Sequence, residues 1–135
     1  MSSGSCYCGQ AKVFFESQPM RQGLCHCGEC KKYTGSAYSV NVIVSEKGWK
    51  TEGALKTISK TARSGNTIST IICPECGTSM YREGATFPGQ KALQAGILDD
   101  MDLLNNLKME VELFAPQRVS WVPKLAGTED KHGMN

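Results

Sequence analysis

The segment Cys73-Pro74-Glu75-Cys76-Gly77 and its counterpart near the start of the chain, Cys6-Tyr7-Cys8, carry the spacing that decides the fold. The first pair of cysteines matches the C-x2-C spacing of zinc sites. The second pair is two residues apart, so in an extended chain both sulfurs point to the same side. The two pairs together predict one site of four thiolates. Such closed sites are typically structural, and this one would join strands far apart in the sequence.

A second group of cysteines lies between these pairs, in Cys25-His26-Cys27-Gly28-Glu29-Cys30. Cys25 and Cys27 share one face of an extended chain, and a helical turn after Gly28 would bring Cys30 back to the same ion. Once the other four cysteines are used, this segment supplies three sulfurs. Three protein ligands with one open position are the pattern of a reactive zinc site.

The residues by themselves leave other ligand sets open. The six-residue segment could share ligands with Cys6 and Cys8, and His26 could fill the fourth position. We expect His26 to point away from the ion, because it lies between two cysteines that share a face. A set of buried or redox-active thiols is the alternative without metal. The tight clustering of all seven cysteines favours metal binding over it.

Length and composition are those of a small globular protein. The chain has 135 residues, with 40% hydrophobic and 21% charged residues, which fits one domain. A formal charge of +2 without a basic run gives no reason to expect a nucleic-acid partner. No stretch reaches the roughly 18 apolar residues of a membrane span, so we expect no membrane partner either. The oligomeric state is left open.

We expect one zinc-binding, catalytic-type domain over residues 1–123 and a loosely ordered tail over 124–135, which is polar and contains glycine. The first residues lack a basic region followed by an apolar one, so the sequence shows no signal peptide. An odd number of cysteines does not fit a closed set of disulfides. Reduced thiols are typical of the cytoplasm, which is where we expect this protein.

Short β-branched and aromatic runs predict a mainly antiparallel β protein. The expected strands cover 12–16, 37–45, 55–59, 67–72, 91–95 and 109–114. Helical signal is sparse: one short turn is expected over 28–32, and another over 99–107, capped by Asp99 or Asp100. We interpret the acidic side chains Asp99, Asp100 and Asp102 as a helix start rather than a catalytic pair.

Three segments of this sequence resemble the glutathione-dependent formaldehyde-activating enzyme family, whose domain is shared by centromere protein V. The resemblance spans residues 4 to about 121. It is carried by Gly4-Ser5-Cys6-Tyr7-Cys8-Gly9, by Cys25-His26-Cys27-Gly28-Glu29-Cys30-Lys31-Lys32-Tyr33-Thr34-Gly35, by Cys73-Pro74-Glu75-Cys76-Gly77-Thr78, and further by Ala95-Gly96-Ile97-Leu98-Asp99-Asp100 and Trp121.

The resemblance implies a mainly β, Mss4-like fold with short helical turns and two Zn²⁺ ions per chain. It implies that Cys6, Cys8, Cys73 and Cys76 hold a structural ion. It further implies that Cys25, Cys27 and Cys30 hold a catalytic one. The activity implied is that of a carbon–sulfur lyase of the S-(hydroxymethyl)glutathione synthase type, which joins formaldehyde to glutathione.

Three thiolates on a zinc dication carry a net charge of −1, which suits a substrate thiol better than it polarises a carbonyl. A thiol bound there loses its proton and can attack an aldehyde carbon. Lys31 and Lys32 are weak candidates for binding the substrate, and Arg63 is weaker still. Thr34, Gly35 and Ser36 could offer donors beside the ion. Trp121 and the other large aromatic residues are expected in the core.

Three functions compete at this point. A zinc enzyme acting on a thiol and a small aldehyde leads, with a carbon–sulfur enzyme for a different biosynthetic substrate as its variant. A non-catalytic, zinc-stabilised binding module is the second, and the weak charge and missing basic tail argue against it. A redox or metal-storage protein is the third, although storage needs less of a β framework than this chain predicts.

Overall fold

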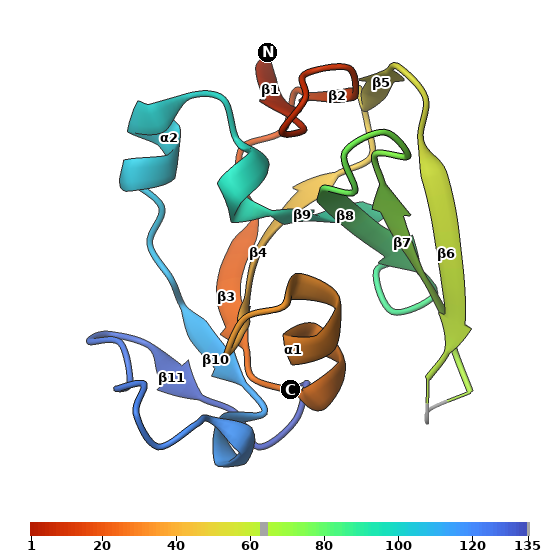
Figure 1. Cartoon of the computed structure of the whole chain (residues 1–135). Coiled ribbons are helices and arrows are strands. Elements are labelled where there is room, and N and C mark those ends of the chain that lie inside the picture. The colour runs from red at the N-terminus through yellow and green to blue at the C-terminus, as the bar shows by residue number, and fades with distance from the viewer. Residues whose placement is uncertain (63–64, 135) are drawn as a thin grey trace.

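The computed structural model describes residues 1–62 and 65–134 of the chain (Figure 1). Its described part is mainly β, as the sequence predicts. A three-stranded antiparallel sheet has the order β1-β2-β5, and a larger sheet of eight strands has the order β11-β10-β3-β4-β9-β8-β7-β6. The strands are β1 (Ser2–Ser5), β2 (Lys12–Phe15), β3 (Arg21–Cys25), β4 (Ser39–Ser45), β5 (Lys50–Glu52), β6 (Lys56–Thr61), β7 (Thr67–Ile72), β8 (Ser79–Gly84), β9 (Gln90–Gln94), β10 (Val111–Leu113) and β11 (Glu129–Asp130).

Short helices connect these strands. They are α1 (Gly28–Thr34), the 3-10 turn η1 (Ala95–Ile97), α2 (Met101–Asn105) and the 3-10 turn η2 (Ala115–Gln117). Asp100 caps α2, because its Oδ1 accepts hydrogen bonds from the backbone N–H groups of Asp102 and Leu103. The predicted capping role is therefore confirmed. Asp99 does not pair with it and instead accepts hydrogen bonds from the hydroxyls of Ser3 and Ser5.

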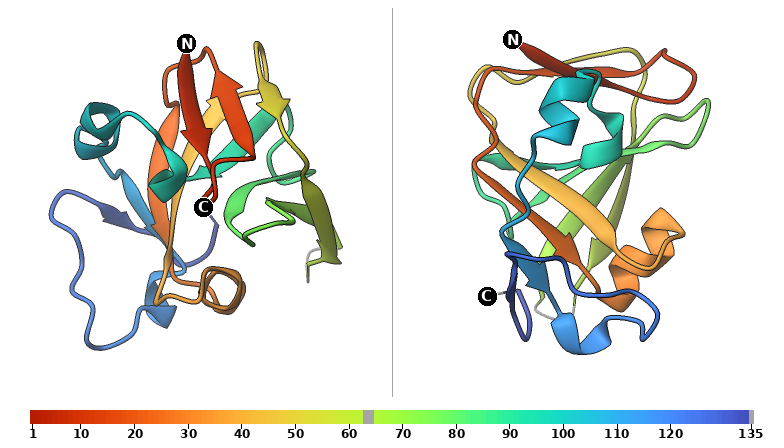
Figure 2. Two further views of the ribbon diagram at one scale, coloured as in Figure 1. Left: turned by 45° about the horizontal axis from the view of Figure 1, so that its top comes forward. Right: turned by 90° about the vertical axis from the view of Figure 1, so that its left-hand side faces the viewer.

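The two sheets enclose one hydrophobic core. Its fully buried members include Val13 and Phe15 from the small sheet and Val42, Met80 and Leu93 from the large one. Figure 2 shows the N-terminal strands at one end of the molecule and α1, η2 and the C-terminal segment at the opposite end. The large sheet runs between these two ends.

Strand β3 was missed by the sequence analysis because its residues are polar and include a glycine. Gly23 pairs with Val111 of β10, which runs parallel to β3. A Cβ atom on Gly23 would lie 2.7 Å from Val111 Cγ2 and 2.9 Å from its carbonyl oxygen. Glycine is therefore required by the close approach of a strand nearly ninety residues away. Strands β1, β5, β8 and β11 were also missed, and the β10 pairings with β3 and β11 are parallel rather than antiparallel.

The C-terminal segment, which the sequence predicts as a loosely ordered tail, adds a two-residue strand to the large sheet. Strand β11 pairs with β10, and the Thr128 side chain is buried. Its hydroxyl donates to Glu112 at 2.6 Å. The buried carboxylate of Glu112 therefore holds the polar C-terminal segment through Thr128. The domain boundary at residue 123 remains a prediction. Trp121, expected in the core, is 74% exposed.

Candidate metal centres

Four sulfur atoms converge where the turn between β1 and β2 meets the turn between β7 and β8. They belong to Cys6, Cys8, Cys73 and Cys76, here called the four-cysteine cluster, and lie within 4.8 Å of one another. Sγ of Cys8 is 3.6 Å from that of Cys6 and 3.9 Å from that of Cys73. Ligands about 2.3 Å from a tetrahedral zinc ion lie about 3.8 Å apart, so the cluster fits such an ion.

The turns around this cluster supply hydrogen bonds to its sulfurs. The backbone N–H of Ala11 donates to Cys6 Sγ at 3.3 Å, and Gln10 Nε2 donates to Cys73 Sγ at 3.2 Å. Hydrogen bonds from the side chain and backbone of Thr78 lower the pKa of Cys76 to about 5. Gly77 closes the second turn with a φ of 78°, a conformation that favours glycine. The cluster connects the small sheet to the large one.

Cys25, Cys27 and Cys30 form a second group, here called the three-cysteine cluster, whose sulfurs also lie within 4.8 Å of one another. Cys25 ends β3, Cys30 is buried in the first turn of α1, and Cys27 is the N-cap of that helix. The side chain of Cys27 accepts a hydrogen bond from the backbone N–H of Cys30 at 3.3 Å. As the sequence predicts, a helical turn after Gly28 brings the third sulfur back to the first two.

The environment of Cys27 favours its thiolate form. Hydrogen bonds from the thiols of Cys25 and Cys30 lower the pKa of Cys27, and backbone N–H groups of Cys30 and Glu29 add to this effect. A thiolate at this position is what a divalent metal ion needs as a ligand. The two clusters are separate groups in the described residues, so no cysteine is shared between them.

His26, the candidate fourth ligand, lies outside the three-cysteine cluster and is fully buried. Its Nε2 is 2.9 Å from Oε1 of Glu112. An ionised carboxylate only accepts hydrogen bonds, so Nε2 is the donor. Nδ1 of His26 has no hydrogen-bond partner among the described residues. The side chain thus points away from the sulfurs, as its place between two same-face cysteines predicts.

Glu112 connects the segment 25–30 to the rest of the structure through hydrogen bonds. It is fully buried, and its two oxygens accept from His26, from Arg118, from the Thr128 hydroxyl and from the Leu125 backbone N–H. Burial alone would raise its pKa, but the hydrogen bonds from Thr128, His26 and Leu125 and the charge of Arg118 lower the pKa to about 2. One carboxylate therefore ties β10 and the C-terminal segment to the loop that carries the three-cysteine cluster. The sequence analysis gave no sign of this role, because Glu112 looks like a solvent-facing residue in an alternating strand.

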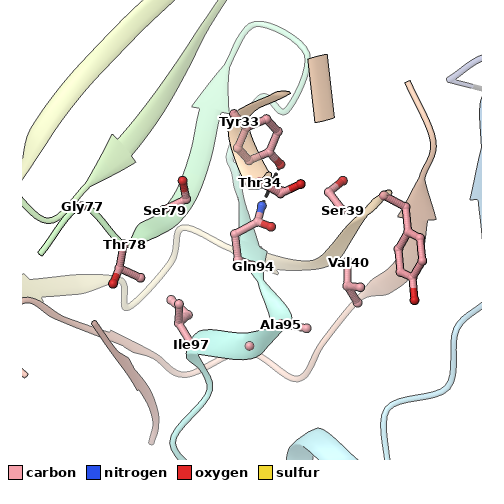
Figure 3. A pocket seen from close by; sticks show the side chains of 12 residues that line it. Tyr33, Thr34, Ser39, Val40, Gly77, Thr78, Ser79, Gln94, Ala95 and Ile97 are labelled. Atoms are coloured by element: carbon pink, nitrogen blue, oxygen red, sulfur yellow. Dashed lines mark hydrogen bonds between the residues drawn. The ribbon is translucent and has the colours of Figure 1, made fainter. Parts of the chain in front are cut away.

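A pocket of about 490 Å³ is lined in part by Tyr33 and Thr34 of α1, the helix that also carries Cys30 of the three-cysteine cluster (Figure 3). Its size falls in the usual range of small-molecule sites. Ser39 lines it and accepts a hydrogen bond from Asn41 Nδ2 at 2.9 Å, and the hydroxyl of Thr34 donates to the carbonyl of Cys30 at 2.6 Å. Gly77, Thr78 and Ser79, which follow the four-cysteine cluster, form another wall. The pocket therefore lies between segments positioned by both clusters.

Tyr33 and Gln94 face each other in this pocket (Figure 3). Nε2 of Gln94 donates to the Tyr33 hydroxyl at 2.8 Å. Arg82 packs over the Tyr33 ring, 4.5 Å from its centroid. Burial, together with the charge of Cys30, raises the pKa of Tyr33 to about 12, so this phenol is a hydrogen-bond donor at neutral pH. Neither Tyr33 nor Gln94 was singled out from the sequence, because nothing in their local spacing reports a pocket.

The basic candidates have different surroundings. Lys31 Nζ donates to the backbone carbonyl of Gln117 at 2.6 Å, which connects α1 to η2. Lys32 is exposed. Arg63 lies outside the described residues. A role for either lysine in substrate binding remains a prediction, and so does a catalytic role for the three-cysteine cluster.

Comparisons with known proteins bear on this arrangement. A family model described as glutathione-dependent formaldehyde-activating enzyme matches residues 1–117. The crystal structure of a Rhodobacter sphaeroides protein has a similar fold, with a TM-score of 0.58 and 18% identity over 72% of this chain and 87% of that chain. No curated protein matches the chain. In the described residues, no helix is both long and apolar enough to cross a membrane.

Proposed function

This chain belongs to the glutathione-dependent formaldehyde-activating enzyme family, and we propose that it is a zinc-dependent carbon–sulfur lyase or synthase. Its substrates would be a thiol, in the first instance glutathione, and a small aldehyde such as formaldehyde. Its product would be the S-hydroxymethyl adduct. The family supports the substrate pair, and the convergence of three cysteines beside a pocket supports the reaction type. We place this reaction in the cytoplasm, where the thiols stay reduced.

Both clusters fit zinc by the chemistry and spacing of their sulfurs. The four-cysteine cluster would hold one ion in a closed site, and the three-cysteine cluster a second. A zinc ion in the three-cysteine cluster would offer an open position in which a thiol is held as its thiolate. The protein's own contribution is to hold the substrates in reacting geometry, which can supply much of the rate of a two-substrate reaction.

The protein groups at this site stabilise negative charge on sulfur. The backbone N–H of Cys30 and the thiols of Cys25 and Cys30 stabilise negative charge on the Cys27 sulfur. In the reaction, the substrate sulfur forms a bond to the aldehyde carbon, and the carbonyl electron pair moves to oxygen. The proton that leaves the thiol ends on that oxygen through water. The addition therefore accounts for all its atoms and electrons, and it needs neither a protein nucleophile nor an oxidant or reductant.

The test uses zinc-loaded protein with glutathione and ¹³C-formaldehyde. Adduct formation should exceed the spontaneous rate and vanish in Cys27→Ser, as measured by exchange NMR. In cobalt-substituted protein, glutathione should change the visible spectrum from that of three sulfurs with one lighter ligand to that of four sulfurs. A rate equal to that of the Cys27→Ser variant, with no spectral change at saturating glutathione, would contradict the proposal.

One observation favours a different thiol as the second candidate. The residues that line the pocket among those described carry no charged side chain, whereas glutathione has two carboxylates and an ammonium group. A smaller or less charged thiol would leave fewer charges without partners in the pocket. The same cobalt titration with a panel of cellular thiols distinguishes the two. Tighter binding of a neutral thiol than of glutathione would favour the second candidate.

A further inference from the structure

The Tyr33 side chain is held from two sides in the pocket wall. Arg82 covers its ring at 4.5 Å, and Arg82 is itself fixed by a 3.0 Å hydrogen bond from its Nε to the Thr70 hydroxyl. At the other end, Gln94 Nε2 donates to the Tyr33 hydroxyl. A side chain fixed at both ends has little rotamer freedom left to lose when a ligand binds, which is what a functional group needs.

The hydrogen bonds of Gln94 determine whether the Tyr33 hydroxyl acts as donor or acceptor toward Gln94. Nε2 of Gln94 also donates to Asn41 Oδ1 at 3.3 Å, and Asn41 Nδ2 donates to Ser39 Oγ at 2.9 Å. Both N–H bonds of the Gln94 amide are therefore used, one of them on Tyr33. The Tyr33 oxygen is the acceptor in that bond, so its own O–H is left to donate, and the Ser39 hydroxyl, another group of the pocket wall, lies within its hydrogen-bonding reach.

Five other residues of the pocket lining carry hydroxyls, namely Thr34, Tyr38, Ser39, Thr78 and Ser79, and three of these hydroxyls have close polar partners. The Thr34 hydroxyl donates to the Cys30 carbonyl, the Ser39 hydroxyl accepts from Asn41, and the Thr78 hydroxyl lies 3.2 Å from the Cys76 sulfur. Tyr33 follows Cys30 by three residues in α1, so the two lie on the same face of the helix. The phenol therefore reaches the pocket beside the cluster without being part of it.

We infer that Tyr33 is a catalytic residue that donates a hydrogen bond to the carbonyl-derived oxygen as the thiol adds to the aldehyde. Gln94 and Arg82 are positioning residues that hold it. This inference rests on the proposed function. The carbon–sulfur bond forms, the carbon–oxygen π pair becomes an alkoxide, and the Tyr33 O–H stabilises that charge. In the reverse reaction the same bond holds the hydroxyl of the adduct while its carbon–sulfur bond breaks.

Tyr33→Phe tests the inference because it removes only the hydroxyl. Removal of a single donor to a developing oxyanion typically lowers kcat by roughly 10²-fold. We expect a fall of that order in kcat, with the KM for the thiol and the cobalt spectrum with thiol unchanged. Tyr7→Phe, which removes a hydroxyl from a side chain that is 93% exposed, is the matched control and should keep the wild-type rate. Gln94→Leu should give an intermediate loss in kcat.

A binding measurement separates this inference from the proposed function. S-(2-hydroxyethyl)glutathione and S-propylglutathione differ by a hydroxyl in place of a methyl group. Wild-type protein should prefer the hydroxyl by roughly 3- to 10-fold, the worth of one hydrogen bond, and Tyr33→Phe should lose the preference. If wild-type protein forms adduct and Tyr33→Phe keeps both kcat and the preference, the inference is wrong while the proposed function stands. If wild-type protein forms no adduct, the proposed function and the catalytic role of Tyr33 are wrong together.

Discussion

The four-cysteine cluster and the three-cysteine cluster both consist of cysteine thiols, but their members are separated by very different distances in sequence. The first joins residues 65 positions apart, such as Cys8 and Cys73, and ties the small sheet to the large one. The second is contained in the six residues from Cys25 to Cys30, at the junction of β3 and α1. A ligand set assembled from distant segments stabilises the whole fold, whereas a local set can lose its ion and leave the sheets paired. Both clusters have neighbours in the pocket wall, Thr34 next to Cys30 and Thr78 next to Cys76.

Cys73→Ser should have the largest effect on folding. Structural zinc in small domains contributes roughly 10–16 kcal/mol of binding free energy, more than the total stability of a typical domain. We expect the variant to lose cooperative unfolding and the dispersed amide spectrum of the wild-type protein. Circular dichroism melting and NMR would measure this. A cooperative transition near the wild-type Tm would contradict the long-range role of the four-cysteine cluster.

Glu112→Gln should be the next most destabilising change, because it weakens the buried hydrogen bonds that connect β10 to the segment of the three-cysteine cluster. Loss of the charge from a buried, fully hydrogen-bonded carboxylate costs about 2–4 kcal/mol. The pKa of Glu112 is lowered from 4.5 to about 2 in the folded protein, so its contribution is complete above pH 4.5 and is lost as the pH falls toward 2. The difference in unfolding free energy between wild type and variant should therefore shrink with acid.

Urea unfolding of both proteins at pH 7, 5, 4 and 3 in one zinc-containing buffer measures this difference. Loss of thiolate ligands in acid is common to both proteins and cancels in the comparison. Glu110→Gln, at an exposed residue just before β10, is the matched control and should stay within about 0.5 kcal/mol of wild type. A difference for Glu112→Gln that grows as the pH falls would contradict the lowered pKa.

Cys27→Ser should leave the fold almost unchanged while activity is lost. Serine is a good N-cap, so α1 keeps the hydrogen bond to its first turn. The four-cysteine cluster is not changed by this substitution. Cys27→Ala, which lacks the cap, should be less stable than Cys27→Ser by about 1 kcal/mol. Melting curves and metal content would show this, with about two ions in wild type and about one in each variant. Loss of both ions from Cys27→Ser would mean that the clusters are coupled.

The smallest effects are expected at the two lysines of α1. Lys31→Ala should cost about 0.5–1 kcal/mol of stability, because it removes the hydrogen bond to the Gln117 carbonyl. Lys32→Ala should leave stability unchanged and raise the KM for an anionic thiol by roughly two- to five-fold, the worth of one exposed charge. Both are measured by unfolding and steady-state kinetics. An equal KM for the two variants and wild type would remove the lysines from substrate binding.

Many local features could be predicted from the sequence because their causes are local. The spacing of cysteines places sulfurs on one side of a short segment, so both clusters were predicted with their members. Asp100 was predicted as a cap because capping involves the next two or three residues. The strands predicted over 67–72 and 12–16 are present as β7 and β2, because their β-branched and aromatic residues contribute Val13, Phe15 and Ile71 to the core. The mainly β class follows from the same runs.

Other features of the fold and the pocket depend on contacts between residues distant in sequence, and only the tertiary structure determines them. Gly23 has to be a glycine within its strand because Val111 passes too close for a side chain. Glu112 is buried where His26, Arg118 and Thr128 converge on it. Tyr33 and Gln94, 61 positions apart, meet only when β9 packs beside β4 and α1. Cysteine ligands can be recognised from spacing because a metal site restricts a few neighbouring dihedrals. A pocket and its buried polar network are set by the pairing of strands, which the sequence of any one strand does not record.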